Sequence, residues 1–512
     1  MQLSRTALPL LRAEGRPGVP TPDLLALPER VLQFGTGVLL RGLVDYFVDK
    51  ANKAGVFNGR IVVVKSTARG DVDAFARQDN IYTLCVRGLE GGSKVDETII
   101  NGSISRVLSA AHDWKAVLEC AADPALQLVV SNTTEVGIAL VSDDVAATPP
   151  TSFPGKLLAC LWERYRRLGG APESGLVIVP TELISGNGAK LKSIVLELCR
   201  ENHLPDSFLR WVDGANDFCN SLVDRIVPGR LSPADATAMK ARLGYDDELL
   251  IMAEVYRLWA IETSRDRTRA ILSFSQADHG VVVTTDIEKF KELKLRLLNG
   301  SHTFTCGLAV MAGIATVKQA MQAPAFAAFI GRLMVDEIVP AISGPGLPAA
   351  EARQFAANVL DRYRNPFLEH QWLSITLQYT NKMRLRNVPL IEQYYQKFGT
   401  VPQRMALGLA AWLLFMRSTE AAPGAHVGRA GGREYPITDD RAALLRELWG
   451  AGGSPVGRAL GSTELWGTDL ALLPGLVDAV ERNLRLLEQR GPAAVLAELQ
   501  QEERGDVRLT KE

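Results

Sequence analysis

Apolar residues follow different patterns in the two halves of the chain. Up to about residue 290, short continuous apolar runs end in polar residues, and such runs predict strands that are buried on both faces. The runs lie at 31–34, 59–67, 126–131 and 176–180. From residue 293 onward, apolar residues recur at helical spacing instead. We therefore expect an α/β half followed by an all-α half.

The helical half contains successive amphipathic patterns with almost no strand signal between them. They lie at 293–321, 325–339, 349–363, 368–379, 387–397, 401–417, 439–449, 472–490 and 493–503. Two glycine-rich segments, 421–433 and 450–461, are predicted to be long loops. In the first half, strand-like runs at 81–87 and 94–100 flank a glycine-rich turn, which predicts a hairpin inserted into the parallel sheet.

The first apolar run leads into a glycine turn and then into a helical pattern at 38–54. The turn consists of Phe34, Gly35, Thr36 and Gly37. Strand, Gly-x-Gly and helix form the first turn of a dinucleotide-binding unit, where the backbone approaches a pyrophosphate at the helix N-terminus. Leu40 replaces the third glycine of the full pattern, so an ordinary strand-turn-helix fits about equally well. Arg41 can supply a cation to a phosphate, or it can be a surface arginine.

Polar residues at the ends of the later strands extend this candidate site. An NAD site often has an acid after the second strand to bind the ribose. This chain has Lys65 there, which suits the 2′-phosphate of NADP or leaves the ribose to backbone and water. Asn132 and Thr133 follow the strand at 126–131, and ligands bind beyond such carboxyl ends. Asn187 follows the next strand and can point an amide into the same cleft, although an asparagine before glycine is commonly a turn residue.

Three polar residues open the second half: Lys294, Asn299 and His302. On an α-helix Asn299 and His302 share a face, and Lys294 lies slightly over two turns before His302. A lysine can act as a base when burial or a nearby charge lowers its pKa, an amide can stabilise an alkoxide, and an imidazole can orient a substrate or relay a proton. The leucines between these residues also fit an ordinary core helix.

Charged residues in two further segments can contact a substrate. Asp224 and Arg225 stand between apolar residues, where a buried pair orients a ligand or forms a structural salt bridge. The segment 364–384 combines cations with an imidazole, which suits a carboxylate or a polyhydroxylated chain if it faces a cleft. As a solvated helix face it would need no such role. Its candidate substrate-binding residues are His370, Lys382 and Arg384.

Composition narrows the possible function classes. The 512 residues are 47% hydrophobic, enough for two cores, and the net charge of −1 gives no reason to expect nucleic acid or an anionic membrane as a partner. The six cysteines are scattered and form no C-x-x-C pair, which argues against a zinc site or a disulfide framework. No apolar run approaches the roughly 20 residues that span a bilayer. We expect a cytoplasmic protein, monomeric or a small homo-oligomer, without metal.

Together these pieces resemble the polyol-specific long-chain dehydrogenases, the mannitol dehydrogenase family, over nearly the whole chain. The resembling stretches lie at 32–37, 131–135, 182–184, 218–227, 298–303 and 364–366. The resemblance implies a Rossmann-like dinucleotide-binding domain at 1–290 and an all-helical substrate and catalytic domain at 291–512. It also implies NAD as cofactor, with the pyrophosphate at Gly35, Gly37 and Arg41.

The family reaction is hydride transfer between a nicotinamide cofactor and a secondary alcohol or a ketone, without metal. By this resemblance Lys294 is the general acid/base. Asn299 and Asn187 are the amides that stabilise the alkoxide. His302 positions both the substrate oxygens and Lys294.

The resemblance also assigns Asp224 to substrate orientation and Lys382 to the substrate chain. Mannitol-oxidising members differ from this chain at Ser374 and at the strand tip with Glu182, so a sugar acid is the expected small-molecule substrate. The candidate cations for its carboxylate are His370, Lys382, Arg384 and Arg225.

The expected reaction is the reduction of a keto-uronate, tagaturonate with NADH giving altronate and NAD+. The same chemistry on fructuronate or on a neutral polyol such as mannitol is the nearest alternative. A nicotinamide-binding protein without catalytic activity is an alternative of a different class.

Overall fold

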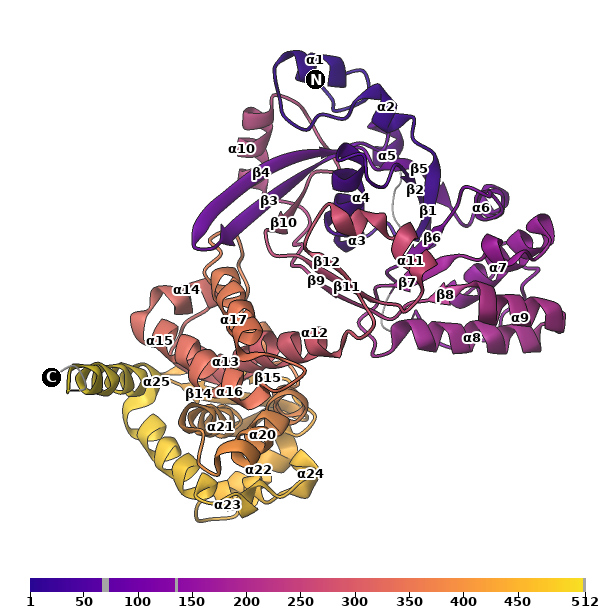
Figure 1. Cartoon of the computed structure of the whole chain (residues 1–512). Helices are drawn as coiled ribbons and strands as arrows, with labels where there is room; N and C mark the ends of the chain where they lie inside the picture. Colours follow the sequence, from indigo (N-terminus) through magenta and orange to yellow (C-terminus); the bar gives the residue numbers. More distant parts are fainter. Residues whose placement is uncertain (67–72, 134–136, 510–512) are drawn as a thin grey trace. The chain divides into compact units, whose positions relative to one another are not determined.

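The structure, a computed structural model, describes residues 1–66, 73–133 and 137–509, with side chains described up to residue 503. The chain divides into two compact units (Figure 1). The first consists of Met1–Gly88 and Lys94–Glu288, and the second of Leu89–Ser93 and Lys289–Glu512.

A six-stranded sheet organises the first unit, and every neighbouring pair of its strands is parallel. In spatial order the strands are β5 (Ile104–Ser109), β2 (Arg60–Lys65), β1 (Glu29–Phe34), β6 (Leu128–Ser131), β7 (Val177–Pro180) and β8 (Asp217–Phe218). Numbered along the chain, this is the order 3-2-1-4-5-6 of dinucleotide-binding folds, with the winding direction reversing between β1 and β6. The Rossmann-like fold class is thereby confirmed.

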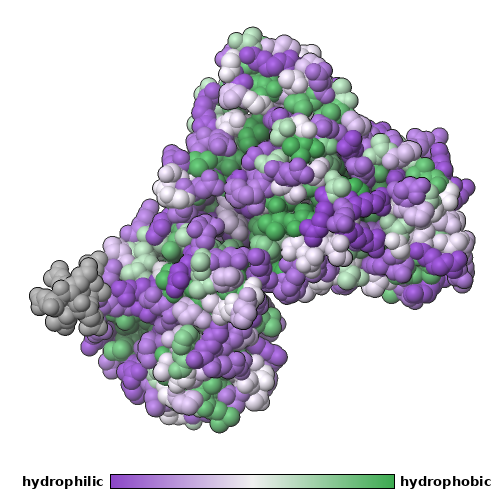
Figure 2. All heavy atoms as spheres, in the orientation of Figure 1, coloured by the Kyte–Doolittle hydropathy of each residue, from purple (hydrophilic) through white to green (hydrophobic). Residues whose placement is uncertain are grey.

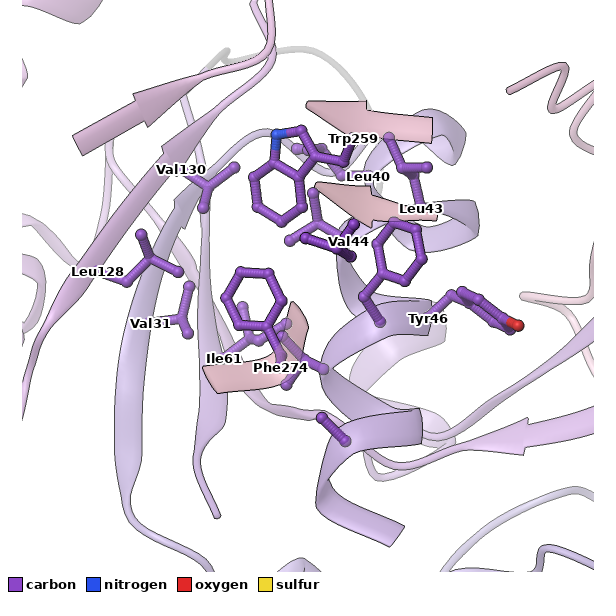
Figure 3. Close-up of a cluster of buried hydrophobic side chains, with 14 of the residues drawn as sticks. Val31, Leu40, Leu43, Val44, Tyr46, Ile61, Leu128, Val130, Trp259 and Phe274 are labelled. Carbon is purple, nitrogen blue, oxygen red and sulfur yellow. The ribbon is translucent and has the colours of Figure 1, made fainter. Parts of the chain in front are cut away.

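Successive residues of each strand point to opposite faces of the sheet, which creates two cores. In β1, Val31 belongs to one core, while Leu32 and Phe34 belong to the other. Figure 3 shows the first core, where the rings of Trp259 and Phe274 lie among aliphatic side chains. These two rings stack with centroids 5.3 Å apart. Burial on both faces explains why the strands are continuously apolar.

Helices cover the faces of this sheet, and α7, α8 and α9 lie together in Figure 1. The α-helices of the first unit are α1 (Leu8–Ala13), α2 (Pro22–Leu25), α3 (Val38–Gly42), α4 (Val44–Lys53), α5 (Asp73–Arg77), α6 (Trp114–Ala121), α7 (Phe153–Leu168), α8 (Asn187–Glu201), α9 (Asp206–Ala215), α10 (Pro233–Leu243) and α11 (Asp266–Ile271). Two 3₁₀ turns complete the set, η1 (Pro172–Ser174) and η2 (Ser273–Gln276).

The helix predicted at 38–54 is broken into α3 and α4. The break falls at Leu43, whose backbone angles (φ −129°, ψ −73°) are not helical. Arg225 Nη1 donates to the carbonyl oxygen of Gly42 at 2.5 Å. A Cβ added at Gly42 would lie 2.9 Å from Val227, so no larger residue fits there. A tertiary contact therefore takes the carbonyl at the end of α3, and helical spacing alone could not reveal this.

The predicted hairpin exists, but it is not part of the parallel sheet. It comprises β3 (Tyr82–Glu90) and β4 (Ser93–Asn101), and β3 pairs with β10 (Ile251–Glu254) in a separate three-stranded sheet. A third sheet contains β12 (Val281–Thr284), β11 (Leu258–Glu262) and β9 (Ser221–Asp224). The expectation that the hairpin enters the main sheet was wrong because strand pattern does not specify the pairing partner.

The second unit is mainly helical, as expected. Its α-helices are α12 (Glu288–Glu292, which begins one residue before the boundary), α13 (Ser301–Met311), α14 (Val317–Gln322), α15 (Pro324–Arg332), α16 (Val339–Ile342), α17 (Ala349–Tyr363), α18 (Trp372–Ile375), α19 (Tyr379–Lys382), α20 (Val388–Phe398), α21 (Gln403–Phe415), α22 (Ala442–Gly450), α23 (Val456–Leu460), α24 (Thr463–Trp466) and α25 (Leu476–Leu509). Three π-helical segments, η3 (Leu293–Gly300), η4 (Leu333–Ile338) and η5 (Met383–Asn387), and the 3₁₀ turn η6 (Leu470–Leu472) lie among them.

The buried helix α21 packs against α13 and α25. A Cβ added at Gly408 of α21 would lie 2.5 Å from Phe304, so glycine allows the two helices to approach closely. Helix α25 bends at Gly491, where φ is 75°, just before Pro492. The two separate helical patterns predicted at 472–490 and 493–503 reflect this break.

The glycine-rich segment 421–433 is not a loop but lies within a three-stranded antiparallel sheet. Its strands are β13 (Ser418–Ala422), β14 (Ala425–Ala430) and β15 (Arg433–Ile437). Gly431 and Gly432 both have positive φ, 54° and 74°, as a two-residue type I′ hairpin requires. The Gly-Gly pair was therefore a hairpin signal that the prediction missed.

No helix in the described ranges is long and apolar enough to cross a membrane. Hydrophilic residues are spread over the visible faces of both units (Figure 2). All six cysteines are buried thiols.

Candidate active site

The glycine turn after β1 has the backbone shape that a phosphate-binding turn needs. Gly35 has φ 132°, and a Cβ added there would lie 2.9 Å from the carbonyl oxygen of Asn132. Gly37 begins α3 with ordinary angles, and a Cβ added there would meet nothing within 4 Å. Gly35 is thus required by the fold, whereas Gly37 leaves open space where a ligand can approach the backbone. Leu40, in place of the third glycine, is fully buried.

Arg41 is neither a surface arginine nor directed at open space. Its side chain is 9% exposed, and Nη1 donates to the carbonyl oxygen of Leu249 at 2.6 Å. The guanidinium also lies over the rings of Phe75 and Tyr82, 5.6 and 5.4 Å from their centroids. Burial lowers the pKa of Arg41. Its phosphate-binding role stays a prediction, and these contacts favour a structural role.

A buried carboxylate organises the polar ends of β6 and β7. Glu182 is 4% exposed and accepts hydrogen bonds from Thr133 N at 2.8 Å, Thr133 Oγ1 at 2.9 Å and Ser131 Oγ at 3.1 Å. Asn132 donates to Thr181 Oγ1 at 2.9 Å. These residues lie beyond the carboxyl ends of the strands at the switch point, where the fold binds ligands. The rest of the stretch 131–135, residues 134 and 135, lies outside the described residues.

Lys65 is the last residue of β2 and is partly exposed. It is followed by Ser66, whose hydroxyl is buried without a partner among the described residues. Residue 67, the end of the predicted second strand, is outside the described ranges. Lys65 stands at the end of the second strand, as predicted, and its place beside a ribose stays a prediction.

The side-chain amide of Asn187 forms hydrogen bonds with backbone groups of the first unit. Its side-chain nitrogen donates to the carbonyl oxygens of Pro180, Glu182 and Ser221 at 3.0–3.1 Å. Its oxygen accepts from the backbone N–H groups of Gly188 and Ser221 at 2.9 Å. Both amide hydrogens are therefore used. These bonds favour the alternative that Asn187 anchors the turn, and its action on an alkoxide stays a prediction.

Asp224 and Arg225, at the end of β9, are both buried, at 7% and 6% exposure. Besides its bond to Gly42, Arg225 donates through Nε to the carbonyl oxygen of Glu254 at 2.9 Å, and its guanidinium lies 4.5 Å from the ring centroid of Tyr46. Burial lowers the pKa of Arg225 to about 10. Arg225 thus holds backbone segments together, which does not favour it as the carboxylate-binding cation.

In the second unit, the segment that carries Lys294 and Asn299 is π-helical. Residues five apart are about 1.4 turns apart on an α-helix and so point to different sides. In a π-helix, i→i+5 hydrogen bonds place such residues on successive turns of one face. The π segment η3 therefore aligns Lys294 with Asn299, which α-helical spacing did not predict. Both residues are partly exposed.

His302 follows in α13 and is only 7% exposed. Its ring stacks on Tyr363 with centroids 4.2 Å apart and meets the rings of His370 and Trp372 edge-on at 5.2 and 5.6 Å. Nε2 has no hydrogen-bond partner among the described residues. A buried, unpartnered ring nitrogen is unusual and marks a place where a ligand can bind.

Electrostatics keep the His302 ring neutral. Burial first, and then His370, Arg362, Arg386 and Lys382, lower its pKa well below the usual range. His370 lies at an exposed edge, and partial desolvation together with Arg362 and Lys382 lowers its pKa as well. Both imidazoles can therefore act as neutral donors or acceptors at physiological pH.

The cations near His302 are only partly those predicted. Lys382 is close, but Arg384 is exposed, and its guanidinium lies 3.5 Å from the place where a Cβ on Gly467 would be. Arg386 instead reaches the residue after His302, donating to Thr303 Oγ1 at 3.2 Å. Arg362, which is 6% exposed, was also missed. The four-residue spacing of Lys382 and Arg386 could have indicated this second cation.

Comparisons with known proteins cover both units. The model of the mannitol dehydrogenase Rossmann domain matches residues 29–272, and that of the mannitol dehydrogenase C-terminal domain matches residues 286–488. The altronate oxidoreductase of Halalkalibacterium halodurans is 39% identical over 480 residues, covering 91% of this chain and 92% of that protein. The chain belongs to the mannitol dehydrogenase family. The family resemblance inferred from the motifs is confirmed.

Other members of the mannitol dehydrogenase family agree in sequence and in fold. The altronate oxidoreductase of Bacillus subtilis is 36% identical, covering 91% of this chain and 94% of its own length. Mannitol 2-dehydrogenase of Pseudomonas fluorescens, in a ternary complex with NAD and D-mannitol, is 25% identical with a TM-score of 0.67, covering 98% of this chain and all of that one. A D-sorbitol dehydrogenase shares the fold, with a TM-score of 0.76 at 20% identity, covering 97% of this chain and all of that chain.

In the described part of the chain, no group of three or more His, Cys, Asp or Glu side chains is arranged to hold a metal ion.

Proposed function

We propose that this protein is an NAD-dependent oxidoreductase of a sugar acid, which reduces tagaturonate with NADH to altronate and NAD+. The observation that carries the proposal is the similarity to proteins named altronate oxidoreductase, at 36–39% identity over 91% of this chain. In the Pseudomonas relative of the same family, the ligands are NAD and a polyol.

Two features of the first unit support a dinucleotide site: its strand order and its glycine turn. The strand order brings the ends of β1 and β6 together, and the turn at Gly35 and Gly37 leaves backbone free for close approach. Gly35, Thr36 and Gly37 would hold the pyrophosphate, and Phe34, the last residue of β1, would precede them at the edge of the cofactor site. Asn132 and Thr133 would line the cofactor site, and Lys65 would lie near the ribose. When bound, the nicotinamide supplies the hydride.

In the second unit, Lys294 would act as the general acid that gives a proton to the ketone oxygen during reduction. A proton donor must lie within hydrogen-bond reach of the atom that receives negative charge. Asn299, on the same face of η3, would donate an amide hydrogen to that oxygen and stabilise the developing alkoxide without competing for the proton. His302 is neutral, and its Nε2, which has no hydrogen-bond partner in the described part of the chain, would orient the substrate hydroxyls.

Each unit by itself has further polar groups that suit a substrate chain. Lys382 and His370 surround His302 in the second unit and suit a polyhydroxylated acid. Asp224 of the first unit would orient the substrate through its carboxylate. Lys65 stands where an NAD site often has an acid, and a lysine there also suits the 2′-phosphate of NADP. The test therefore has to compare NADH with NADPH.

The test is the oxidation of NADH, followed at 340 nm, with tagaturonate, fructuronate and fructose in parallel and repeated with NADPH. We expect rapid turnover of tagaturonate with NADH. Turnover of fructuronate or fructose alone would keep the family chemistry but refute the proposed substrate. NADH binding without turnover of any sugar in the panel would point to a binding protein instead.

A further inference from the structure

Arg386 is a partly buried cation, and its one side-chain partner among the described residues is neutral. It belongs to η5, and Nη1 donates to Thr303 Oγ1 at 3.2 Å. Among the described residues, no carboxylate forms an ion pair or a hydrogen bond with its guanidinium. A guanidinium has five N–H donors, so most of its donors remain available.

The surroundings of Arg386 add like charge rather than opposite charge. Lys382 lies one helical turn before it, and burial together with Arg386 lowers the pKa of Lys382. Arg386, Lys382 and Arg362 all act on His302 as cations. Asp439 is a nearby carboxylate that acts in the opposite direction and raises the pKa of Lys382. Both of its oxygens already accept hydrogen bonds, from the backbone N–H groups of Thr380 and Arg441. Like charges held together in a partly desolvated place destabilise the fold unless an anion joins them.

A second π segment, η3, holds the main chain of Arg386 in this position. Arg296 of η3 donates through Nη1 to the carbonyl oxygens of Leu385 and Arg386, at 3.1 and 2.7 Å. Arg296 itself is fixed by an ion pair with Glu292 at 3.0 Å. The main chain at Arg386 is therefore tied to the segment that carries Lys294 and Asn299.

The side chain of Arg386 is tied to the same segment. Its partner Thr303 donates from Oγ1 to the carbonyl oxygen of Asn299 at 2.7 Å, so one hydroxyl links the guanidinium to the end of η3. Thr303 is 1% exposed and directly follows His302. A fixed cation with unused donors beside the groups proposed for the ketone is a site prepared for an anion.

We propose that Arg386 binds the carboxylate of the substrate, with Lys382 beside it, and thereby selects sugar acids over neutral polyols. The inference rests on the proposed function for the identity of the sugar acid. A guanidinium matches a carboxylate in planar, two-bond geometry, whereas a hydroxymethyl group at the same place gains no charge-assisted bond. A hexuronate carries its carboxylate at the end of the chain away from its ketone, so its two ends need different binding groups. Arg384, which the sequence suggested, is exposed and lies against Gly467 instead.

The test compares three variants of the full-length protein, Arg386→Met, Arg386→Lys and the exposed control Arg384→Met. Each is measured for binding of altronate and gluconate by calorimetry in the presence of NADH, with the neutral alditols of the same configurations in parallel. Turnover of tagaturonate and of its neutral counterpart tagatose is measured with the same samples. The thermal unfolding midpoint is recorded without ligands.

We expect Arg386→Met to weaken binding of the acids, and to raise KM for tagaturonate, about 10- to 100-fold, the usual effect of losing one charge-assisted bond. Arg386→Lys should restore part of this loss, because it keeps the charge but not the two-bond geometry. Binding of the alditols and turnover of tagatose should not change. Arg384→Met should behave like the wild type.

The unfolding midpoint separates ligand binding from a structural role. Removal of a cation that lacks an anionic partner should leave the midpoint of Arg386→Met unchanged or raise it. A lowered midpoint together with equal losses on acids and neutral compounds would show that Arg386 is structural and overturn the inference. So would wild-type affinity of Arg386→Met for the acids, or a wild-type protein that binds aldonates no better than alditols. If the wild type prefers aldonates but does not reduce tagaturonate, the proposed function fails while the carboxylate site stands.

Discussion

At the scale of single residues, the state of His302 decides what its imidazole can do. The ring is buried between Tyr363 and two other rings, and its pKa lies well below the usual range because of burial and of nearby cations. A neutral ring can accept a hydrogen bond from a substrate hydroxyl or donate one, but it carries no charge for the reaction. The pH dependence of activity between pH 6 and 8 should therefore not arise from His302.

We expect the imidazole of His302 to remain neutral well below the pH of about 6.5 at which an ordinary histidine becomes charged, because burial and nearby cations lower its pKa. Because the folded pKa is lowered, the unfolded chain binds the extra proton first as pH falls, so His302 reduces stability below about pH 6.5. NMR of the ¹⁵N-labelled histidines measures this directly, and His302→Gln assigns the signal among the six histidines. Titration of that signal near pH 6.5 would contradict the account.

At the scale of elements, the two segments that matter most are short and irregular. The glycine turn between β1 and α3 exposes backbone, and the π-helix η3 brings Lys294 and Asn299 onto one face. The pattern of apolar residues predicted the strand before the glycine turn and the helix after it. It also predicted a helix in the segment that contains Lys294 and Asn299. This pattern could not predict the break at Leu43, because the break arises where Arg225 donates a hydrogen bond to the carbonyl oxygen of Gly42. It could not predict the π-helix either, because residue spacing does not determine whether a helix forms i→i+4 or i→i+5 hydrogen bonds.

The two glycines of the turn allow a matched experiment. Gly35→Ala should weaken NADH binding at least about tenfold and also lower stability, because a Cβ at φ 132° would clash with the carbonyl oxygen of Asn132. Gly37→Ala should leave stability unchanged, because its Cβ would meet nothing within 4 Å, yet weaken NADH binding if the pyrophosphate lies there. Fluorescence titration with NADH and urea unfolding measure the two effects. Unchanged NADH affinity in Gly37→Ala would place the pyrophosphate elsewhere.

At the scale of the whole molecule, the first core contains a carboxyl group that makes folding depend on pH. Asp45 is fully buried in α4, and burial raises its pKa to about 8, although Arg41 and Gln33 act in the opposite direction. Between about pH 4 and pH 8 the folded chain keeps a proton that the unfolded chain has lost. Stability therefore falls as pH rises through this window, by at most about 1.4 kcal/mol per pH unit from this group.

Asp45→Asn should remove this dependence. Relative to the wild type, the variant should gain free energy of unfolding as pH rises from 5 to 8, while the exposed control Asp206→Asn should not. Hydrogen exchange of the β1 and β2 amides in increasing urea reports the unfolding of the first unit alone. Parallel curves for wild type and Asp45→Asn across this range would mean that Asp45 is ionised in the fold.

Much of the architecture of the molecule could be predicted from its sequence. Continuous apolar strands, the Gly-x-Gly turn and the change to helical spacing near residue 290 predicted the Rossmann-like fold and the helical second half. The small sheet β13–β15 was missed because its glycines were taken as loop residues rather than as hairpin turns.

The site was predicted less completely than the fold. The family was identified from its motifs, whereas the roles of Lys294, Asn299 and His302 stay predictions. Arg386 rather than Arg384 contacts the residue after His302, and Asn187 and Arg225 bind backbone groups. Both observations depend on where side chains point after folding. Residue type and spacing do not carry that information.

We propose that Lys294 gives the proton to the ketone of a keto-uronate. The most direct measurement is kcat/KM for tagaturonate reduction at neutral pH by the wild type and by Lys294→Met, with the NADH dissociation constant determined on the same samples. We expect a loss of about 10²- to 10⁴-fold in kcat/KM, the range of general acid catalysis, with unchanged NADH binding. Wild-type turnover by Lys294→Met would contradict this proposal.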